Sequence, residues 1–454
     1  MNLAGKKVLV VGLGRTGLAL ARFLTKRRAA VTVTDTAHET TLRDQLQIIR
    51  DLGITAEVGQ HRDATFEGAD LIVISPGVPH TIEPILRAQK RGVPVIGEIE
   101  LAARFIDKPI VAVTGTNGKT TTTELIGAML KSSGRHVFVG GNIGNPLIGY
   151  VEEKTSANVI VAEISSFQLD TIKYFKPKVS VLLNISADHL DRYPDMQAYI
   201  QSKGRIFENQ QAEDTAVLNG SDARVRALSE AIACKKLIYP TPLDNEAGAI
   251  LKNNEIILKL NDDSMLRPHV CILNTDNAGF LGQHNRENAS AATLAALAAG
   301  ATVNGIQTAL NHFKGAAHRL EPIATINNVQ YFNDSKATNV NAVARALEYF
   351  SQPVVLIMGG RDKGSDFAEL KAVIQKHVKT LVLMGEAADR IGAVLGQTTS
   401  VIMAASMRDA VAKARRAAEP AEVVLLSPGC ASFDSYDNYA QRGDDFRQEV
   451  LALK

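Results

Sequence analysis

The sequence lacks tryptophan, has only three cysteines and contains no run of about 20 apolar residues. Aromatic residues make up 5% of the chain, which argues against a stacking surface for single-stranded nucleic acid. The cysteines lie far apart, so they predict neither a disulfide framework nor a cysteine metal site. Without a membrane-length run or a signal-peptide core at the start, we expect a cytoplasmic protein that does not insert into membranes.

The chain also has almost no excess of positive over negative charge. Lys and Arg total 50 against 48 Asp and Glu, a formal net charge of +2, so no polyanionic partner such as nucleic acid is expected. Apolar residues at 45% and charged residues at 22% are ordinary for a globular protein. The length of 454 residues predicts about three domains.

A phosphate-binding loop is predicted between an apolar strand at 109–114 and a helical pattern that ends near Gly134. The loop reads Gly-Thr-Asn-Gly-Lys-Thr over 115–120, with Lys119 placed for a phosphate and Thr120 for Mg²⁺. A full Walker A motif has glycine where this chain has Val113. We interpret the loop as an ATP site; a plain glycine turn is the alternative.

A second nucleotide fingerprint lies near the N-terminus. A strand at 8–11 leads into Gly-Leu-Gly-Arg-Thr-Gly over 12–17, and a later strand at 31–34 ends at Asp35. This order is typical of a Rossmann-type unit with an acid for a ribose or a base, although a plain turn is the alternative. Because it has no Lys-Ser/Thr pair, we expect it to hold a nucleotide as a handle.

Strands and helices alternate along the chain, which predicts an α/β protein of three domains. We expect a Rossmann-like substrate domain at 1–98, a P-loop ATPase-like, mostly parallel central sheet at 99–315, and a doubly wound Rossmann-like sheet at 316–454. A hairpin turning at Asn253 and Asn254 is predicted to extend the central sheet. Arg286 to Ala299 is predicted to be a helix from its alanine content.

Polar residues at strand ends are candidates for chemistry. Glu163 follows a buried strand and suits Mg²⁺, directly or through water, with a helix-starting acid as the alternative. His189 lies beyond the next strand and is a candidate metal or phosphate contact, although a lone histidine is usually structural. Lys203 by itself reads as a solvated helix lysine. The loops 334–339 and 359–364 suit carboxylates or phosphates, or are solvated surface loops.

These motifs resemble, in order and over the whole chain, those of the Mur ligases, which build the peptide stem of peptidoglycan. The resemblance rests on the ATP loop at 114–121 and on four further motifs, at 282–288, 318–321, 333–339 and 359–364. It explains the missing Walker glycine. Within the family, the segments 163–169 and 426–432 look most like those of the member that adds D-glutamate, and the Asp-Asn-Pro-Arg of the diaminopimelate-adding member is absent.

The resemblance implies an ATP-dependent amide ligase acting on UDP-N-acetylmuramoyl-L-alanine and D-glutamate, with two Mg²⁺ ions, as a monomer. The substrate carboxylate attacks the γ-phosphate of ATP, and the amine of D-glutamate then attacks the acyl phosphate. Catalysis and metal binding are assigned to Lys119, Thr120, Glu163, His189 and a carbamylated Lys203. ATP binding is assigned to Gly115, Thr116, Asn117, Gly118, Lys119, Thr120, Thr121, Asn288 and Arg319.

Further residues are implied for the other two substrates. The UDP-substrate is assigned to Gly14, Arg15, Thr16, Asp35, Thr36 and Asn142. The D-glutamate is assigned to Lys336, Thr338, Lys363, Ser432 and the backbone near Tyr439. Phe433 and Tyr439 depart from the aliphatic residue and phenylalanine of the family pattern, which puts the amino-acid pocket in question.

Three other functions compete with this interpretation. The first is another Mur-type ligase or a folylpolyglutamate-type ligase. Folylpolyglutamate-type ligases, however, resemble only the second and third domains expected for this chain. A nicotinamide-dependent dehydrogenase would explain residues 12–17 and Asp35, yet it leaves Lys119 and Thr120 without a role. A nucleotide-binding regulator without catalysis is the third alternative.

Overall fold

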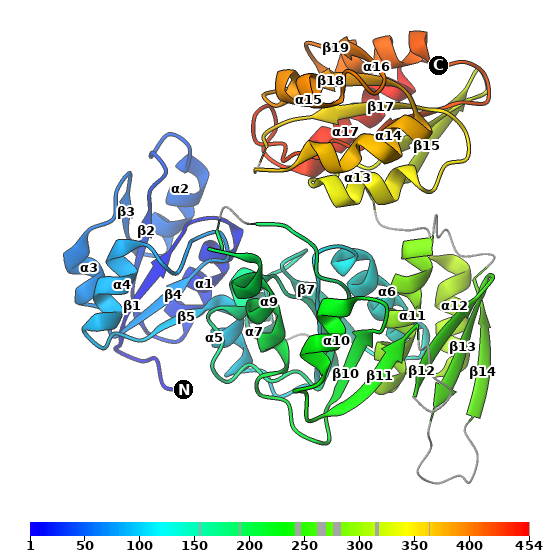
Figure 1. Cartoon of the computed structure of the whole chain (residues 1–454). Helices are drawn as coiled ribbons and strands as arrows, with labels where there is room; N and C mark the ends of the chain where they lie inside the picture. Colours follow the sequence, from blue (N-terminus) through cyan, green and yellow to red (C-terminus); the bar gives the residue numbers. More distant parts are fainter. Residues whose placement is uncertain are drawn as a thin grey trace. The chain divides into compact units, whose positions relative to one another are not determined.

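The computed structural model describes residues 1–153, 156–189, 192–240, 247–260, 269–275, 283–313, 317–362 and 364–453. Three sheets with covering helices form an α/β protein, which confirms the predicted fold class (Figure 1). No helix in the described part of the chain is both long and apolar enough to cross a membrane.

The chain divides into two compact units. The first comprises Met1–Ile185, Asp195–Asn277 and Asn288–Asn311; the second comprises Ser186–Pro194, Ala278–Glu287 and His312–Lys454. The first two sheets therefore share one unit. The boundaries proposed after residues 98 and 315 stay predictions, and the second of them lies within residues 314–316, outside the described chain.

The N-terminal sheet has five parallel strands in the order β3-β2-β1-β4-β5. The strands are β1 (Lys7–Val11), β2 (Ala30–Asp35), β3 (Thr55–Val58), β4 (Leu71–Ile74) and β5 (Val95–Gly97). The helices are α1 (Arg15–Lys26), α2 (Arg43–Asp51), α3 (Asp63–Glu67), α4 (Glu83–Lys90) and α5 (Glu98–Ala103). The strands predicted at 8–11 and 31–34 are β1 and β2, whereas the half-buried β3 has no apolar run to indicate it.

The glycine fingerprint lies where β1 pairs with β2 on one side and β4 on the other. Strand order reverses at this point, and ligands bind at such switch points in open α/β sheets. A Cβ atom on Gly17 would lie 2.0 Å from the carbonyl oxygen of Gly12. Only glycine therefore lets α1 pack this closely on the end of β1.

The central sheet has nine strands in the order β14-β13-β12-β11-β10-β9-β6-β8-β7. The strands are β6 (Ile110–Thr114), β7 (Val137–Gly141), β8 (Val159–Glu163), β9 (Val179–Leu182), β10 (Thr215–Asn219), β11 (Lys235–Tyr239), β12 (Gly248–Lys252), β13 (Glu255–Leu260) and β14 (His269–Asn274). The helices are α6 (Lys119–Ser132), α7 (Leu147–Glu153), α8 (Ser166–Leu169), α9 (Met196–Gly204), α10 (Ala223–Ser229), α11 (Gln283–Ala298) and α12 (Val303–His312), with a 3₁₀ turn at Arg205–Phe207.

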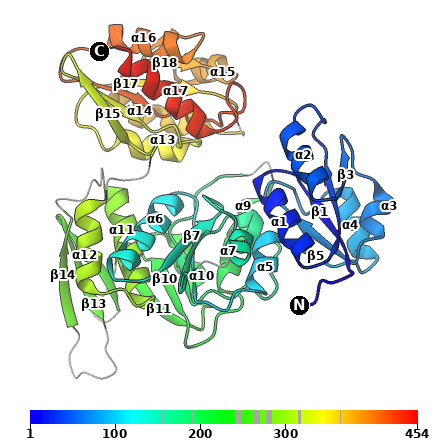
Figure 2. The same cartoon turned by 180° about the vertical axis from the view of Figure 1, so that it is seen from behind.

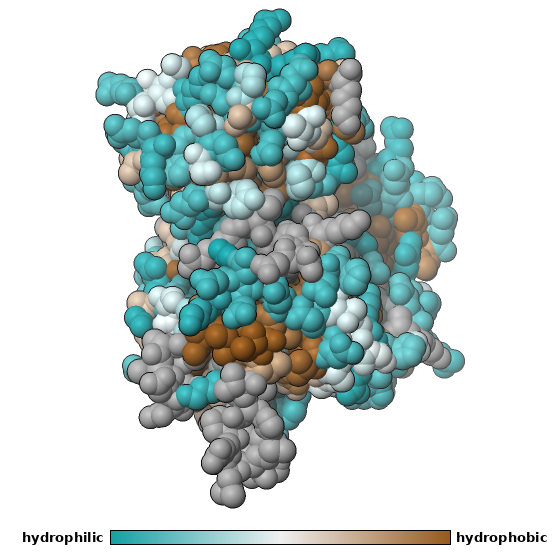
Figure 3. All heavy atoms as spheres, turned by 90° about the vertical axis from the view of Figure 1, so that its right-hand side faces the viewer, coloured by the Kyte–Doolittle hydropathy of each residue, from teal (hydrophilic) through white to brown (hydrophobic). Residues whose placement is uncertain are grey.

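Strands β12 and β13 form the predicted antiparallel hairpin. It turns at Asn253, which has a φ of 53°, a left-handed conformation that asparagine tolerates better than most residues. Strand β14 adds to the hairpin, with Ile250, Ile257 and Ile272 in register on one face. Ile272 is 57% exposed, and Figure 3 shows apolar side chains gathered on the side of the molecule that presents these strands.

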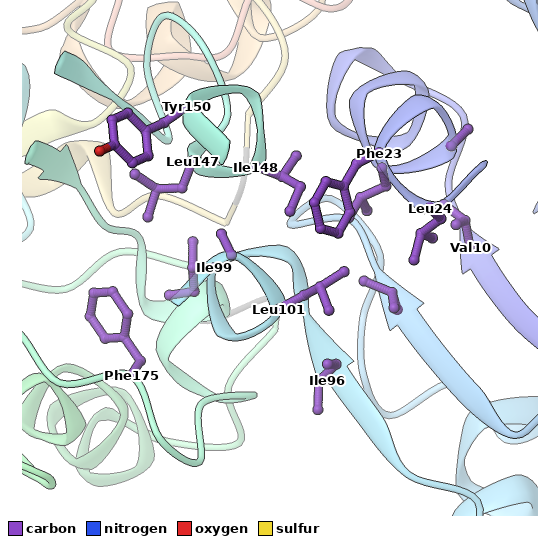
Figure 4. Packing of buried hydrophobic residues seen from close by; sticks show 14 of the residues in the cluster. Val10, Phe23, Leu24, Ile96, Ile99, Leu101, Leu147, Ile148, Tyr150 and Phe175 are labelled. Atoms are coloured by element: carbon purple, nitrogen blue, oxygen red, sulfur yellow. The ribbon is translucent and has the colours of Figure 1, made fainter. Parts of the chain in front are cut away.

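One apolar core joins the N-terminal sheet to the central sheet. It includes Phe23 of α1, Leu101 of α5, Ile148 of α7 and Phe175, all nearly inaccessible to solvent (Figure 4). Helix α5 follows β5 directly and packs against α7. Because interiors are close-packed, this shared core makes the two sheets one structural body.

Two buried glutamates of α5 add polar links within this core. Glu98 Oε1 accepts a hydrogen bond of 2.7 Å from the N–H of Ile148 at the start of α7. Glu100 Oε2 accepts three bonds of 2.8–3.0 Å from the N–H groups of residues 173–175, and its other oxygen lies 2.9 Å from Arg104. Burial raises the pKa of Glu98 to about 7.

The C-terminal sheet has six strands in the order β15-β16-β20-β17-β18-β19, and only β15 is antiparallel to its neighbour. Helices α16 and α17 cover one face and α13, α14 and α15 the other (Figure 2). The strands are β15 (Glu321–Ile326), β16 (Val329–Asn333), β17 (Val354–Gly359), β18 (Val378–Met384), β19 (Ser400–Met403) and β20 (Val423–Leu426). The helices are α13 (Val340–Leu347), α14 (Lys371–His377), α15 (Ala388–Leu395), α16 (Met407–Ala417) and α17 (Tyr439–Leu451), with a 3₁₀ turn at Phe367–Leu370.

The raised pKa of Glu98 predicts a pH-dependent stability. Between pH 4.5 and about 7 the folded state binds more protons at this group than the unfolded state, so its contribution to stability falls as pH rises through that window. Glu98→Gln keeps an acceptor for Ile148 without the charge. We expect the free energy of unfolding of the variant to exceed that of the wild type at pH 8 by up to ~3 kcal/mol, with a higher unfolding temperature, and the two to unfold at similar temperatures at pH 4.5.

Glu100→Gln is the matched control, because it removes a charge that faces Arg104. This variant should be less stable than the wild type at pH 8. Thermal unfolding at the two pH values measures both. A Glu98→Gln variant that is less stable than the wild type at pH 8 contradicts the prediction.

Candidate active site

The loop between β6 and α6 has the backbone shape of a phosphate-binding loop. Gly115 has a φ of 152° and Gly118, the residue just before α6, a φ of 86°, both unfavourable for other residues. A Cβ atom on Gly118 would lie 2.4 Å from Oδ1 of Asn288. Asn288 of α11 is thus brought against the loop. The N-terminus of α6 supplies backbone N–H groups and a positive dipole end for an anion.

Asn184, which follows β9, fixes this loop from the side. Its carbonyl oxygen accepts from the N–H of Thr116 at 2.9 Å, and its Oδ1 accepts from the N–H of Asn117 at 2.8 Å. Its Nδ2 in turn donates to the carbonyl oxygen of Asn117 at 3.0 Å. Sequence reasoning missed this role, although a polar residue after a buried strand beside β6 was the available signal.

Two lysines converge on one carbonyl oxygen. Lys119 Nζ donates to the carbonyl oxygens of Gly115 and Thr116, each at 2.9 Å, and Lys203 Nζ donates to that of Gly115 at 2.9 Å. Lys203 is only 2% exposed, and its Nζ lies 4.6 Å from the ring centre of Tyr199. The interpretation of Lys203 as a solvated helix lysine is therefore wrong, because α9 turns this residue into the protein.

Tyr199 is a second residue that sequence reasoning missed. Its hydroxyl lies 3.2 Å from Oγ1 of Thr116, so it links α9 to the phosphate-binding loop. Thr121 is buried behind the loop at the start of α6. Lys203, Tyr199 and the loop form one packed group.

Glu163 ends β8 and is buried beside Thr120. Its Oε2 accepts from Oγ1 of Thr120 at 2.7 Å, and its Oε1 accepts from Nδ2 of Asn142 at 2.9 Å. The alternative of a helix-starting acid does not apply, because Ser165 caps the following helix. The carboxylate and hydroxyl oxygens form the hard donor set that Mg²⁺ prefers.

The fit to Mg²⁺ holds without a larger cluster. Among the residues that the structure describes, no group of three or more His, Cys, Asp or Glu side chains is arranged to hold a metal. Mg²⁺ is commonly bound by one or two carboxylates together with phosphate oxygens and water. His189, with a φ of 57° and its Nε2 3.7 Å from Asp188, belongs to the second compact unit. Its place beside Glu163 stays a prediction.

Asp35 fixes the backbone of the glycine fingerprint in the N-terminal sheet. Its Oδ2 accepts from the N–H of Leu13 at 2.7 Å, and its Oδ1 accepts from that of Ala37 at 2.8 Å. No side chain caps α1, which begins after Gly14. Arg15 donates to Oδ1 of Asn145 at 2.5 Å. Asp35 thus shapes the loop. Thr16 lies in the first turn of α1, and Thr36 follows Asp35 in the chain.

Two further residues at this edge were missed by sequence reasoning. Oγ of Ser75 donates to the carbonyl oxygen of Gly12 at 3.2 Å. His61 Nδ1 lies 2.9 Å from Oγ1 of Thr34, and burial lowers the pKa of His61. Ser75 follows the carboxyl end of the buried strand β4, which was the signal for it. His61 follows β3, which has no apolar run, so the sequence held no such signal for it.

The C-terminal sheet gathers part of the predicted amino-acid pocket. Lys336 Nζ lies 4.9 Å from the ring centre of Tyr439, Ser432 is 2% exposed, and Thr338 is half-buried. Lys363 lies outside the described residues. Phe433 is 60% exposed.

Buried titratable groups lie behind these loops. Burial raises the pKa of Asp334 to about 7, while a hydrogen bond from Ser427 and the charge of Arg319 act in the opposite direction. His318, buried against Asn333, has its pKa lowered by desolvation. Near neutral pH, Asp334 is therefore divided between its protonated and ionised forms, while the nearby imidazole of His318 is mostly neutral.

Comparison with known proteins finds three family models, which match consecutive parts of the chain. "Mur ligase MurD-like, N-terminal domain" matches residues 6–97, "Mur ligase middle domain" matches 113–296, and "Mur ligase, glutamate ligase domain" matches 318–430. These matches span most of the chain. The chain belongs to the Mur ligase family. The phosphate-binding loop at 115–120 lies within the match to the middle domain, and the resemblance inferred from the motifs is confirmed.

Full-length relatives agree. The UDP-N-acetylmuramoylalanine–D-glutamate ligase of Desulfosudis oleivorans is 52% identical over 99% of this chain and 97% of its own length. The protein of the same name from Desulfatibacillum aliphaticivorans is 51% identical over the full length of both chains. A solved pseudomurein peptide ligase of type C from Methanothermus fervidus shares the fold, with a TM-score of 0.62 at 22% identity over 99% of this Mur ligase and all of that chain.

Lys119→Ala tests the ATP loop. Loss of the Nζ charge should remove stabilisation of the transferring phosphoryl group and lower kcat by about 10²–10³-fold. The glycine fingerprint is a separate site, so the Kd for a UDP-linked substrate should change less than about twofold. ADP release and isothermal titration calorimetry measure the two quantities. Loss of both activity and UDP-substrate binding would mean that the sites are not separable.

Proposed function

We infer that this Mur ligase adds D-glutamate to UDP-N-acetylmuramoyl-L-alanine with the hydrolysis of ATP, a step of peptidoglycan synthesis. The observation that carries this inference is the 52% identity, over almost the whole of both chains, to a ligase named for that reaction. Residues 6–97 match the MurD-like N-terminal domain. This match argues against a folylpolyglutamate-type ligase, because such ligases resemble only the later two domains. The ATP loop equally disfavours a dehydrogenase.

In the first step, the terminal carboxylate of the UDP-substrate attacks the γ-phosphate of ATP, giving an acyl phosphate and ADP. Both reactants are anions, so charge stabilisation is the main requirement. Lys119 and the N–H groups at the start of α6 supply positive charge at the loop. Thr120 and Glu163 would hold Mg²⁺, which neutralises phosphate charge when bound.

In the second step, the amine of D-glutamate attacks the acyl carbon, and phosphate leaves as the amide forms. We propose that Lys336, Thr338, Lys363, Ser432 and the backbone near Tyr439 hold the amino acid. Asn288 and Arg319 are proposed for ATP, and Gly14, Arg15, Thr16, Asp35, Thr36 and Asn142 for the UDP-substrate. A second Mg²⁺, held by His189 and a carbamylated Lys203, and a monomeric state complete the proposal.

The link between Asn142 and Glu163 supports one part of this mechanism. Asn142 donates to Glu163 from its side chain at 2.9 Å and from its backbone at 2.8 Å. Asn145, three residues on, accepts from Arg15 at the glycine fingerprint. One short loop therefore connects the proposed metal site with the proposed UDP site, which suits a substrate that must extend from one to the other.

ADP release with UDP-N-acetylmuramoyl-L-alanine and a panel of amino acids tests the function. We expect turnover with D-glutamate, and about 10²-fold less with L-glutamate, L-lysine or diaminopimelate, because a misplaced carboxylate leaves polar groups of the pocket unpaired. Light scattering on the same sample reports the oligomeric state. Turnover with L-lysine in preference to D-glutamate contradicts the proposal.

A further inference from the structure

Arg442 of α17 is a buried arginine in which all three guanidinium nitrogens donate hydrogen bonds within the protein. It is 2% exposed, and burial lowers its pKa to about 10, which leaves it charged at neutral pH. Nε donates to Oγ of Ser335 at 3.0 Å, and Nη2 donates to the carbonyl oxygens of Ser335 at 2.8 Å and Cys430 at 3.1 Å. Nη1 donates to those of Gly359 at 3.4 Å and Ala431 at 3.3 Å.

These acceptors come from three different loops. Ser335 follows β16, Gly359 ends β17, and the pair of residues 430–431 follows β20. The strands are neighbours in the order β16-β20-β17, so their loops lie side by side at the carboxyl edge of the sheet. One side chain thus binds all three loops from the side of α17.

The five hydrogen bonds account for the five N–H donors of a guanidinium. Arg442 therefore has no donor to offer a substrate while this network is intact. Arginine is also the side chain that supplies five donors in a rigid planar fork; lysine supplies three from one atom. The arrangement requires arginine for its shape as well as its charge.

The bonds to carbonyl oxygens also orient the opposite side of each peptide. Because a trans peptide is planar, a carbonyl turned toward the guanidinium turns the next N–H away from it. After Ala431 this N–H belongs to Ser432, and after Gly359 it belongs to Gly360. A Cβ atom on Gly360 would lie 2.3 Å from the carbonyl oxygen of Ala431 and 3.0 Å from Nη1 of Arg442, so there is no room for a side chain at this position.

Ser335 extends the network to the start of α17. Its Oγ accepts from Arg442 and donates to the carbonyl oxygen of Tyr439 at 2.8 Å. The ring of Tyr439 lies beside Nζ of Lys336. Displacement of Arg442 would therefore disturb both Ser335 and, through Tyr439, Lys336.

We propose that Arg442 is a positioning residue for the amino-acid substrate: it holds together the three loops that follow β16, β17 and β20, of which the first carries Lys336 and Thr338 and the last carries Ser432. The inference rests on the proposed function, which places D-glutamate at these loops. Arg442 acts on the pocket through the backbone and does not touch the substrate. Its loss should weaken binding of the amino acid and leave the two nucleotide sites unchanged.

Arg442→Lys keeps the charge and removes the fork. We expect the KM for D-glutamate to rise by at least about tenfold, with the KM values for ATP and for UDP-N-acetylmuramoyl-L-alanine within about twofold of the wild type. Ser335→Ala, a smaller change, removes the hydroxyl that joins Arg442 to Tyr439 and should raise the KM for D-glutamate by about threefold. It decides the question if Arg442→Lys does not fold.

Val450→Ala is the matched control, because Val450 is fully buried on the same helix and packs in the apolar core. It should lower the thermal unfolding temperature and leave the KM for D-glutamate unchanged. If Arg442→Lys behaves like this control, or raises all three KM values alike, the inference is overturned. Failure of the wild type to use D-glutamate would instead overturn the proposed function. If Ser432→Ala raises the KM for D-glutamate and Arg442→Lys does not, only the role of Arg442 is refuted.

Discussion

The carbonyl oxygen of Gly115 accepts hydrogen bonds from two lysines, and the rest of the central site depends on this contact. Lys119 comes from the loop itself and Lys203 from a helix more than 80 residues later, so their meeting fixes α9 against the loop. The ammonium group of Lys119 adds to the positive end of the α6 dipole. An anion entering this loop meets positive charge that is already in place, which lowers the reorganisation that catalysis requires.

The same physical device recurs at the C-terminal sheet. There a single buried guanidinium, Arg442, draws backbone carbonyls of three loops toward itself. In both places a buried side-chain nitrogen donates to backbone carbonyl oxygens and so fixes the loops that supply them. A buried polar group is costly without such partners. The protein therefore positions its loops with the same contacts that satisfy these buried donors.

Much of the architecture could be predicted from local pattern. The apolar run at 109–114 predicted the buried strand β6, and the Asn253–Asn254 turn predicted the hairpin. Strand β3, with Thr-Ala-Glu-Val half-buried at the sheet edge, gave no apolar run and was missed. The phosphate-binding loop was predictable because glycine at left-handed positions and Lys-Thr at the helix start are local requirements.

The fold class, the two glycine loops and the family could be predicted from the sequence, because these depend on short-range periodicity and on contiguous motifs. The roles of residues whose partners are remote emerged only from the folded structure. Lys203 reads as a surface lysine until α9 packs on the loop, and Arg442 as one more helix charge until three strands bring their ends beneath it. Burial and hydrogen bonding are set by contacts between distant segments, which no local pattern contains.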